Sequence, residues 1–212
     1  MFGFNSDREM PRKPSQERAK ATVEAIVSAG FIALGRDGLK GCTTRGIADL
    51  AGVGIGSLYE YFSDKNEIFA AMSEQLASDV VATIRASTPV AARLDVRSAV
   101  LVLAKNFREL LERNDGRYLR CARHVVQMDI QKQLARIDKA LLDLAMQFVM
   151  HHPELMRLKR LPAMSYLFIH GGVAAVVRYL SDPKPQLTFD DIAEGLALMV
   201  EHSLQGELRA AG

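Results

Sequence analysis

Residues 43–65 read TTRGIADLAGVGIGSLYEYFSDK, and this stretch indicates the fold more clearly than any other part of the chain. It predicts a short helix, a turn that contains Gly52, a second short helix and the start of a third. Thr43 or Thr44 can cap the first helix, because a hydroxyl there accepts a hydrogen bond from an otherwise unpaired backbone N–H. Gly52 suits the left-handed conformation that ends a helix. Two short helices joined in this way match a helix-turn-helix that reads DNA.

The side chains of this stretch divide into an inward set and an outward set at helical spacing. The apolar positions that we expect to be buried are Ile47, Ala48, Leu50 and Ala51 in the first short helix and Leu58 and Phe62 in the second. The positions left facing outward are Ile55, Gly56, Ser57, Tyr59, Glu60 and Tyr61. The second helix therefore offers small and hydrogen-bonding residues at its start, where a recognition helix enters the major groove.

These spaced residues also resemble a known family. The motifs are Thr43-Thr44-Arg45-x-Ile47-Ala48, Ala51-Gly52-Val53, Gly56-Ser57-Leu58-Tyr59 and Phe62-x-x-Lys65. They resemble the N-terminal motif of TetR-type transcriptional regulators, and the resemblance covers roughly residues 16–70. It implies a homodimeric repressor that a small-molecule effector releases from a palindromic DNA operator. A DNA-binding regulator without a ligand, controlled through a protein partner, stays open as the alternative.

We expect an all-α fold, with an N-terminal three-helix helix-turn-helix head followed by a C-terminal helical bundle. The expected domains are a flexible basic arm at 1–15, the DNA-binding domain at 16–66 and an effector-binding and dimerisation domain at 67–212. Outside the two short helices, apolar spacing and breaker residues predict helices at about 16–36, 63–87, 92–113, 118–150, 163–180 and 189–208. Ser63 is the expected cap of the second of these helices, Pro89 its breaker, and residues 114–116 a turn.

Composition limits the kind of partner and compartment. Hydrophobic residues make up 49% of the 212 residues and charged residues 25%, which is ordinary for a globular protein. The net charge is only +2, from 27 basic and 25 acidic residues, so any affinity for DNA must come from local charge placement. Cys42 and Cys121 lack CxxC spacing, which favours a reducing compartment. The N-terminal stretch lacks the apolar core of a signal peptide, so we expect a cytoplasmic protein without membrane association.

The expected contacts with double-stranded DNA come from the head. By resemblance, Thr44 and Lys65 hold phosphates beside helix N-termini, and Tyr59 and Tyr61 reach the DNA through their hydroxyls. Arg45 is the best candidate for reading a base, because its planar fork matches guanine O6 and N7. A phosphate contact or a surface ion pair is an equally open interpretation of Arg45.

Three other positions complete the expected reading surface, namely Ile55, Gly56 and Ser57 at the start of the recognition helix. Ile55 can offer only an apolar contact, such as one to a thymine methyl, and Gly56 lets the backbone approach closely. Gly46 departs from the family, where a polar residue usually precedes the Ile-Ala pair. Glycine forfeits a capping box with Thr43 and costs about 1 kcal/mol of helix propensity relative to alanine. We therefore expect a mobile first short helix until DNA is bound.

The body offers candidates for dimerisation. The helices at about 163–180 and 189–208 combine small residues, such as Gly171 and Gly172, with apolar faces. Such helices can form intrachain core or pair with a two-fold mate as a four-helix bundle. The family resemblance favours the homodimer.

The body also holds candidates for an effector pocket, which are Phe107, His124, Met128, Met146, Phe148, Tyr166, His170 and Arg178. Each has a plain alternative as core or as a paired surface residue. We expect no enzyme, no cofactor and no metal, since the sequence carries no HExxH, GxSxG, Walker or paired-cysteine signature. Cys121 and His124, three residues apart, could form a thiolate pair, but no orienting group accompanies them.

Overall fold

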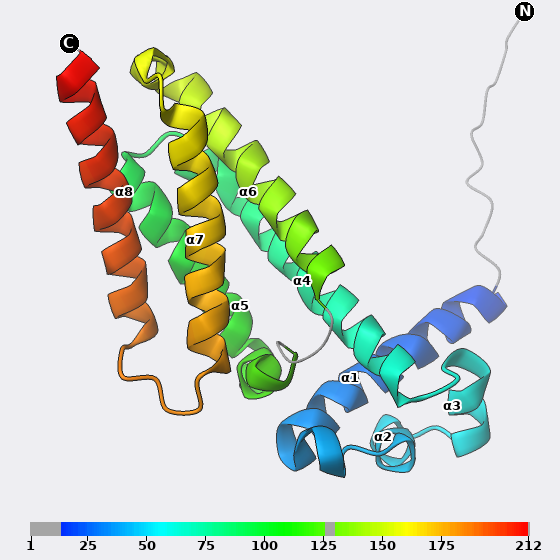
Figure 1. The fold of residues 1–212 in the computed structure, drawn as a ribbon. Helices are drawn as coiled ribbons and strands as arrows, with labels where there is room; N and C mark the ends of the chain where they lie inside the picture. Colours follow the sequence, from blue (N-terminus) through cyan, green and yellow to red (C-terminus); the bar gives the residue numbers. More distant parts are fainter. Residues whose placement is uncertain (1–13, 126–129, 212) are drawn as a thin grey trace, which may run out of the picture.

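The computed structural model describes residues 14–125 and 130–211, and every regular element within them is a helix (Figure 1). The all-α prediction is confirmed. The head consists of α1 (Pro14–Gly41), α2 (Thr44–Ala51) and α3 (Ile55–Tyr61). The body consists of α4 (Lys65–Ala91), α5 (Val96–Val125), α6 (Gln131–His151), the short 3-10 helix η1 (Pro153–Arg157), α7 (Leu161–Ser181) and α8 (Phe189–Ala211). Residues 1–13 of the predicted basic arm lie outside the described residues, and Pro14 already begins α1.

The core of the head is continuous with one end of the body. Ile26 and Leu34 of α1, Ile47 of α2, Leu58 of α3 and Ile68 of α4 are all fully buried in one cluster. Leu50, which was expected to face inward, is 39% exposed. The head core covers α2 on one side only, and Leu50 lies beyond the edge of that side.

α1 and α4 touch closely within this core. A Cβ atom on Gly30 of α1 would lie 2.7 Å from Sδ of Met72 in α4, so a larger residue there would force the Met72 side chain to move. The first turns of α4 therefore belong to the head, while its later turns belong to the body.

The start and end of α4 differ from the sequence-based expectation. Asp64, not Ser63, is the cap: its carboxylate accepts hydrogen bonds from the backbone N–H groups of Asn66 (2.7 Å) and Glu67 (3.0 Å). The Glu67 carboxylate in turn accepts from the N–H of Ser63 at 2.6 Å. Pro89 does not break the helix, which continues to Ala91. A proline in the last turn removes only one helical hydrogen bond, and little helix follows to be lost.

The predicted turn at 114–116 is confirmed as a sharp bend inside α5. Asn114, Asp115 and Gly116 all have left-handed backbones, with φ values of 51°, 57° and 66°. The bend directs residues 117–125 onto α1, where Tyr118 is 2% exposed and Cys121 is completely buried. This last segment of α5 joins the body to the head.

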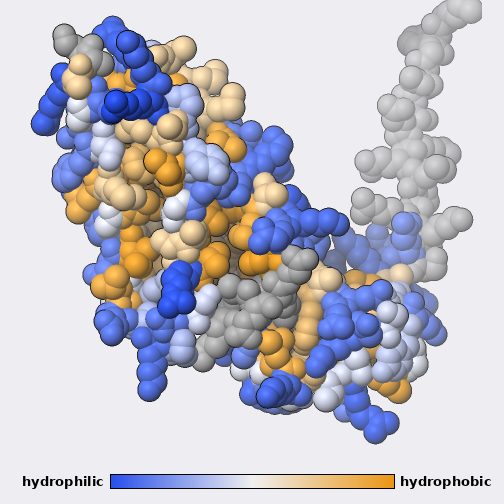
Figure 2. Space-filling view, viewed as in Figure 1, coloured by the Kyte–Doolittle hydropathy of each residue, from blue (hydrophilic) through white to orange (hydrophobic). Residues whose placement is uncertain are grey.

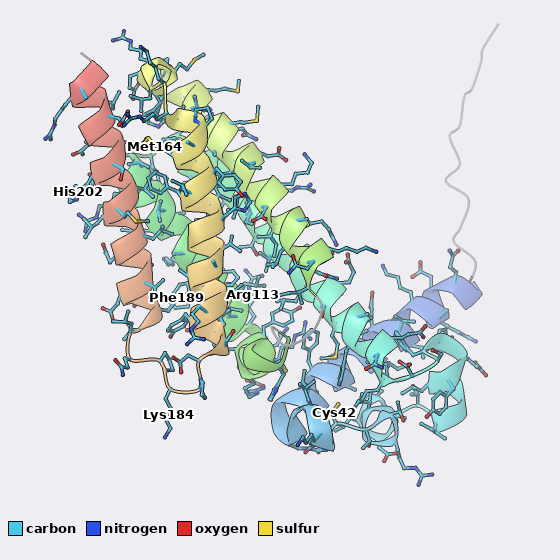
Figure 3. All side chains as sticks on the ribbon, in the orientation of Figure 1. Cys42, Arg113, Met164, Lys184, Phe189 and His202 are labelled. Carbon is cyan, nitrogen blue, oxygen red and sulfur yellow. The ribbon has the colours of Figure 1, made fainter. Side chains whose placement is uncertain are left out.

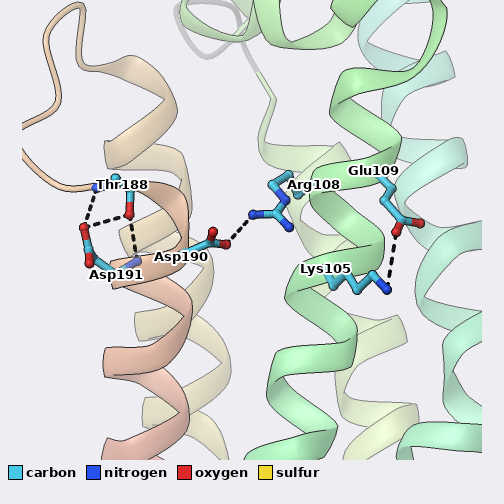
Figure 4. Close-up of polar contacts among 6 residues, drawn as sticks. All are labelled: Lys105, Arg108, Glu109, Thr188, Asp190 and Asp191. Atoms are coloured by element: carbon cyan, nitrogen blue, oxygen red, sulfur yellow. Dashed lines mark hydrogen bonds and ion pairs between the residues drawn. The ribbon is translucent and has the colours of Figure 1, made fainter.

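The remaining body helices form a bundle in which α4 packs against α5 and α6, and α8 packs against α5. Two ion pairs connect α5 with α8, Arg97 to Glu194 (2.9 Å) and Arg108 to Asp190 (Figure 4). Thr188 and Asp191 form a reciprocal cap at the start of α8. The Thr188 hydroxyl accepts from the N–H of Asp191, and the Asp191 carboxylate accepts from the hydroxyl and N–H of Thr188. These hydrogen bonds hold the pKa of Asp191 below its ordinary value.

Apolar side chains gather on the surface of the body, including the face where α7 lies (Figure 2). In the described part of the chain, α7 is the one helix long and apolar enough to cross a membrane, and only 6% of its most apolar window is buried. Core helices of soluble proteins pass the same test of length and composition, so this property is weak evidence for a membrane span. The exposed apolar surface of α7 still requires a cover.

Replacing Asn114 by valine is expected to destabilise the protein by about 1–2 kcal/mol, because a β-branched residue tolerates the left-handed conformation poorly. Asn114→Gly is the matched control and should leave stability nearly unchanged, since glycine adopts positive φ freely. Urea unfolding followed by circular dichroism measures both. Equal stabilities of the two variants would show that the bend does not hold residue 114 in this conformation.

Candidate nucleic-acid interface and body cavity

Local hydrogen bonds build the first half of the helix-turn-helix as the sequence predicts. Thr43 caps α2, with its hydroxyl accepting from the N–H of Gly46 at 3.1 Å. Gly52 ends the helix in the left-handed conformation, with φ 68° and ψ 28°. The next N–H, that of Val53, donates back to the Ala48 carbonyl at 3.1 Å. This closure sets the angle between α2 and α3.

α3 presents its outward residues at the start of the recognition helix. Gly54 precedes it without a side-chain cap, and Leu58 and Phe62 anchor it in the head core. Gly56 and Ser57 are exposed, as predicted. Ile55, expected to face outward, is half-buried and packs against the head core, so only part of its side chain is available to DNA.

Two of the predicted phosphate contacts are brought together across the helix-turn-helix. The hydroxyls of Thr44, at the start of α2, and Tyr59, on α3, lie 3.1 Å apart within hydrogen-bonding distance. Each hydroxyl has one proton and two acceptor lone pairs, so only one proton is used between them. The other proton remains for an acceptor such as a phosphate oxygen. Their spacing of fifteen residues hides this pairing from the sequence.

Lys65 has a partner that the sequence did not suggest. Its ammonium group donates to the Leu39 carbonyl near the end of α1 at 3.1 Å and lies 5.5 Å from the centre of the Phe69 ring. An ammonium group has three donors, so this contact leaves capacity for a phosphate oxygen. Lys65 therefore connects the start of α4 to the end of α1.

Arg45, Tyr61 and Glu60 lie on the outer side of the head. Arg45 is exposed, and no described residue forms an ion pair with its guanidinium group. The surface ion pair considered for Arg45 is therefore not seen among the described residues. Tyr61 is 37% exposed, and Glu60 is exposed beside it.

The two thiols lie inside the protein, with Cys42 in the head (Figure 3). Burial raises the pKa of Cys42, and burial raises the pKa of Cys121 to about 11. The Cys121 thiol donates to the Phe31 carbonyl at 3.0 Å, and the His124 ring lies against Gly38 of α1. A reactive thiolate needs a lowered pKa, so this environment is the opposite of that of a nucleophile.

The body contains an apolar cavity of about 360 Å³ between helices α4 to α8. Of the predicted effector residues, Phe107 lines this cavity, as does Phe148. Phe189, at the start of α8, also lines it, with its ring centre 6.1 Å from that of Phe107 (Figure 3). The lining is almost entirely apolar, as expected for a pocket in a helical bundle.

The other predicted effector residues lie elsewhere. Met146 and Tyr166 are 68% and 62% exposed and do not line the cavity, because they lie on the outer sides of α6 and α7. His170 and Arg178 line a smaller hollow that adjoins the cavity, because Leu134, Val173 and Val177 line both, and His170 lies 3.3 Å from Asp138 there. His124 packs on the head, as described above, and Met128 lies outside the described residues. In the described residues no three His, Cys, Asp or Glu side chains are grouped so that they could hold a metal ion.

An exposed helix-turn-helix on a helical body defines a class of DNA-binding regulators, and comparison with known proteins names the family. Residues 22–72 match the model of bacterial regulatory proteins of the tetR family. By this match the chain carries the DNA-binding domain of the TetR family of transcriptional regulators, which is not a family of enzymes. The predicted family and helix-turn-helix fold are thus confirmed.

Individual relatives are distant. The chain is 25% identical over 141 residues to the nucleoid occlusion factor SlmA of Glaesserella parasuis. The aligned region covers 66% of this chain and 67% of that protein. The crystal structure of a TetR-family regulator from Mesorhizobium loti is similar with a TM-score of 0.66 and 15% identity, over 89% of this chain and 98% of that one. A regulator of the same family from Marinobacter aquaeolei is similar with a TM-score of 0.55 and 19% identity, over 89% and 97%. At these identities the structural likeness shows the fold.

Gly46→Glu is expected to raise the melting temperature. A glutamate at the third position of α2 can reach back to the N–H of Thr43 and gains about 1 kcal/mol of helix propensity over glycine. An added Cβ would lie 3.3 Å from the Thr43 hydroxyl, a contact that a small rotation of Thr43 relieves. Differential scanning calorimetry measures the effect, and Gly46→Ala separates propensity from capping. An unchanged or lower melting temperature in both variants would contradict the expectation.

Native Cys42 and Cys121 are expected to resist alkylation at neutral pH, because burial both raises their pKa values and blocks access. Iodoacetamide labelling followed by mass spectrometry should be slower for the native protein than for the urea-unfolded chain by roughly tenfold or more, since each unit of pKa lowers the thiolate fraction tenfold. Fast labelling of either thiol in the native protein would contradict this expectation.

Proposed function

We propose that this protein is a homodimeric repressor that a small-molecule effector releases from a palindromic operator. The observation that carries the proposal is the position of α4. Its first turns, with Ile68 and Met72, are part of the head core, and its later turns, with Val80 and Ile84, line the cavity. One rigid helix is therefore in contact with both the DNA-reading head and a ligand-sized space.

The head binds DNA through local contacts. Thr44 and Tyr59 act as a hydroxyl pair on one phosphate, and Lys65 and Tyr61 hold the neighbouring backbone. Arg45 reads a base edge in the major groove. The start of α3, with Ile55, Gly56 and Ser57, approaches the bases closely, and the exposed part of Ile55 supplies an apolar contact.

The dimer forms through α7 and α8, at about residues 163–180 and 189–208. Leu167 on α7 is 66% exposed and Met199 on α8 is 49% exposed, which supports a large apolar interface. The two helices pack closely, since a Cβ on Gly172 would lie 3.1 Å from Cδ2 of Leu196. A second copy then covers the apolar surface of α7, with no membrane involved. Two-fold symmetry presents two heads and so selects a palindromic operator.

Release follows from the contacts of α4. A ligand between α4 and α6 shifts the later turns of α4, and the Lys65 contact with Leu39 passes this shift to α1. The separation of the two heads then no longer fits the two half-sites. We place the protein in the cytoplasm, where its operator is.

A DNA-binding regulator controlled by a protein partner is the second candidate. Relatives that carry the name nucleoid occlusion factor, rather than repressor, support considering it. Met146, Met150 and Met156 are 68%, 78% and 74% exposed on the body. Methionines adapt to varied partners, so this group could serve as a docking surface.

The test is fluorescence anisotropy with DNA from the gene's upstream region and with random duplex, at two salt concentrations. We expect tight binding that weakens with salt and discriminates against random duplex. Arg45→Ala should lose roughly 1–3 kcal/mol of that discrimination. Arg85→Ala removes the same charge from an exposed position in the body and serves as the matched control.

Two outcomes decide between the roles of Arg45. An equal loss of affinity for operator and random duplex would identify a phosphate contact instead of a base contact. Weak binding of the wild-type protein to every duplex, including those from random-site selection, would overturn the proposed function.

A further inference from the structure

The shape of the body cavity favours an extended ligand. Lining residues on α7 run from Leu161 to Leu180, nineteen residue steps that span roughly 28 Å at 1.5 Å per residue. The cavity therefore extends along most of α7. A flexible chain can follow this length, whereas a compact ring system would occupy only part of it.

The lining also excludes charge. No Lys, Arg, His, Asp or Glu from the described residues lines the cavity. A carboxylate, phosphate or ammonium inside it would lose its hydration without gaining a partner of opposite charge. The ligand that fits is therefore uncharged.

The polar groups of the lining are few, and two of them are already used within α4. The Ser73 hydroxyl donates to the Phe69 carbonyl at 3.0 Å, and the Thr83 hydroxyl donates to the Asp79 carbonyl at 2.9 Å. Gln133 on α6 differs, because its side-chain oxygen Oε1 is buried and has no hydrogen-bond partner. A buried acceptor without a donor costs free energy, which a ligand hydroxyl at this point would recover.

Gln133 lies close to a polar contact between α6 and α4. Arg136, one turn later on α6, forms an ion pair with Glu74 and donates to the Ser78 hydroxyl at 3.1 Å, both on α4. A ligand held at Gln133 therefore lies beside the Arg136 contacts that join α6 to α4.

Building on the proposed ligand-released function, we propose that the cavity binds an uncharged aliphatic molecule that carries one hydroxyl group. The chain extends between α4, α6 and α7, and the hydroxyl donates to Oε1 of Gln133. The ligand class is thus a fatty alcohol or a similar neutral lipid, and not a fatty acid anion.

Calorimetric titration of the full chain with 1-decanol, n-decane, 2-decanone and decanoate at neutral pH tests this assignment. 1-Decanol should bind most tightly. Gln133→Leu should weaken the binding of 1-decanol about fivefold, which is the net contribution of one hydrogen bond. The same variant should bind n-decane as tightly as the wild type does, or more tightly. Gln147→Leu is the matched control, because Gln147 is an exposed glutamine on the same helix.

Several results would overturn the inference. Decanoate binding as tightly as 1-decanol would show that charge is tolerated. If n-decane or 2-decanone bound as tightly as 1-decanol, the ligand hydroxyl would not be donating a hydrogen bond to Gln133. Absence of 1-decanol binding, measured on protein whose melting transition is intact, would reject the ligand class.

DNA binding without ligand is measured in parallel, so the two proposals fail separately. Operator binding with no uptake of 1-decanol rejects this inference and leaves the regulator intact. Uptake of 1-decanol that depends on Gln133 supports the inference even if no duplex is bound, in which case the proposed function fails.

Discussion

The head is held on the body by the packing of Tyr118 against Phe31. Their ring centres lie 5.0 Å apart in an edge-to-face arrangement, and the Arg117 guanidinium lies 4.9 Å from the Tyr118 ring and 5.5 Å from the Phe31 ring. The Tyr118 hydroxyl donates to the Asp79 carboxylate on α4, and burial together with this bond raises the pKa of Tyr118 to about 12. The contact joins α1, α4 and α5 at one point. Together with the Cys121 contact to the Phe31 carbonyl, it fixes the end of α5 on α1.

This junction makes the left-handed bend at 114–116 necessary. A straight α5 would carry residues 117–125 past α1, whereas the bend brings Tyr118 and Cys121 into the head core. The backbone cost of two non-glycine residues at positive φ is offset by the burial of those side chains. A small shift of α4 or α5 within the body is consequently felt by the head, as regulation by a ligand in the body requires.

The DNA-reading surface and the cavity differ in how their chemistry is built. In the interface that we propose, the head offers hydroxyls and one arginine at the start of short helices. The cavity is lined by apolar side chains from five helices, with Gln133 as a buried acceptor that has no partner. The two proposed ligands, DNA and a small molecule, would thus meet surfaces of different chemistry, although the net charge of the chain is only +2.

The sequence by itself determined the elements that depend on neighbours a few residues away: the Thr43 cap, the Gly52 stop, the turn at 114–116 and the family motif of the helix-turn-helix. The sequence was misleading where two neighbouring residues could both cap a helix: Asp64, and not Ser63, caps α4. Only the tertiary structure decided which side of each helix is covered, and therefore that Leu50, Met146 and Tyr166 are exposed. It also brought Thr44 to Tyr59 and Lys65 to Leu39. Helical periodicity shows that a face is apolar, but the helix that covers this face is distant in the chain, and no local spacing records that contact.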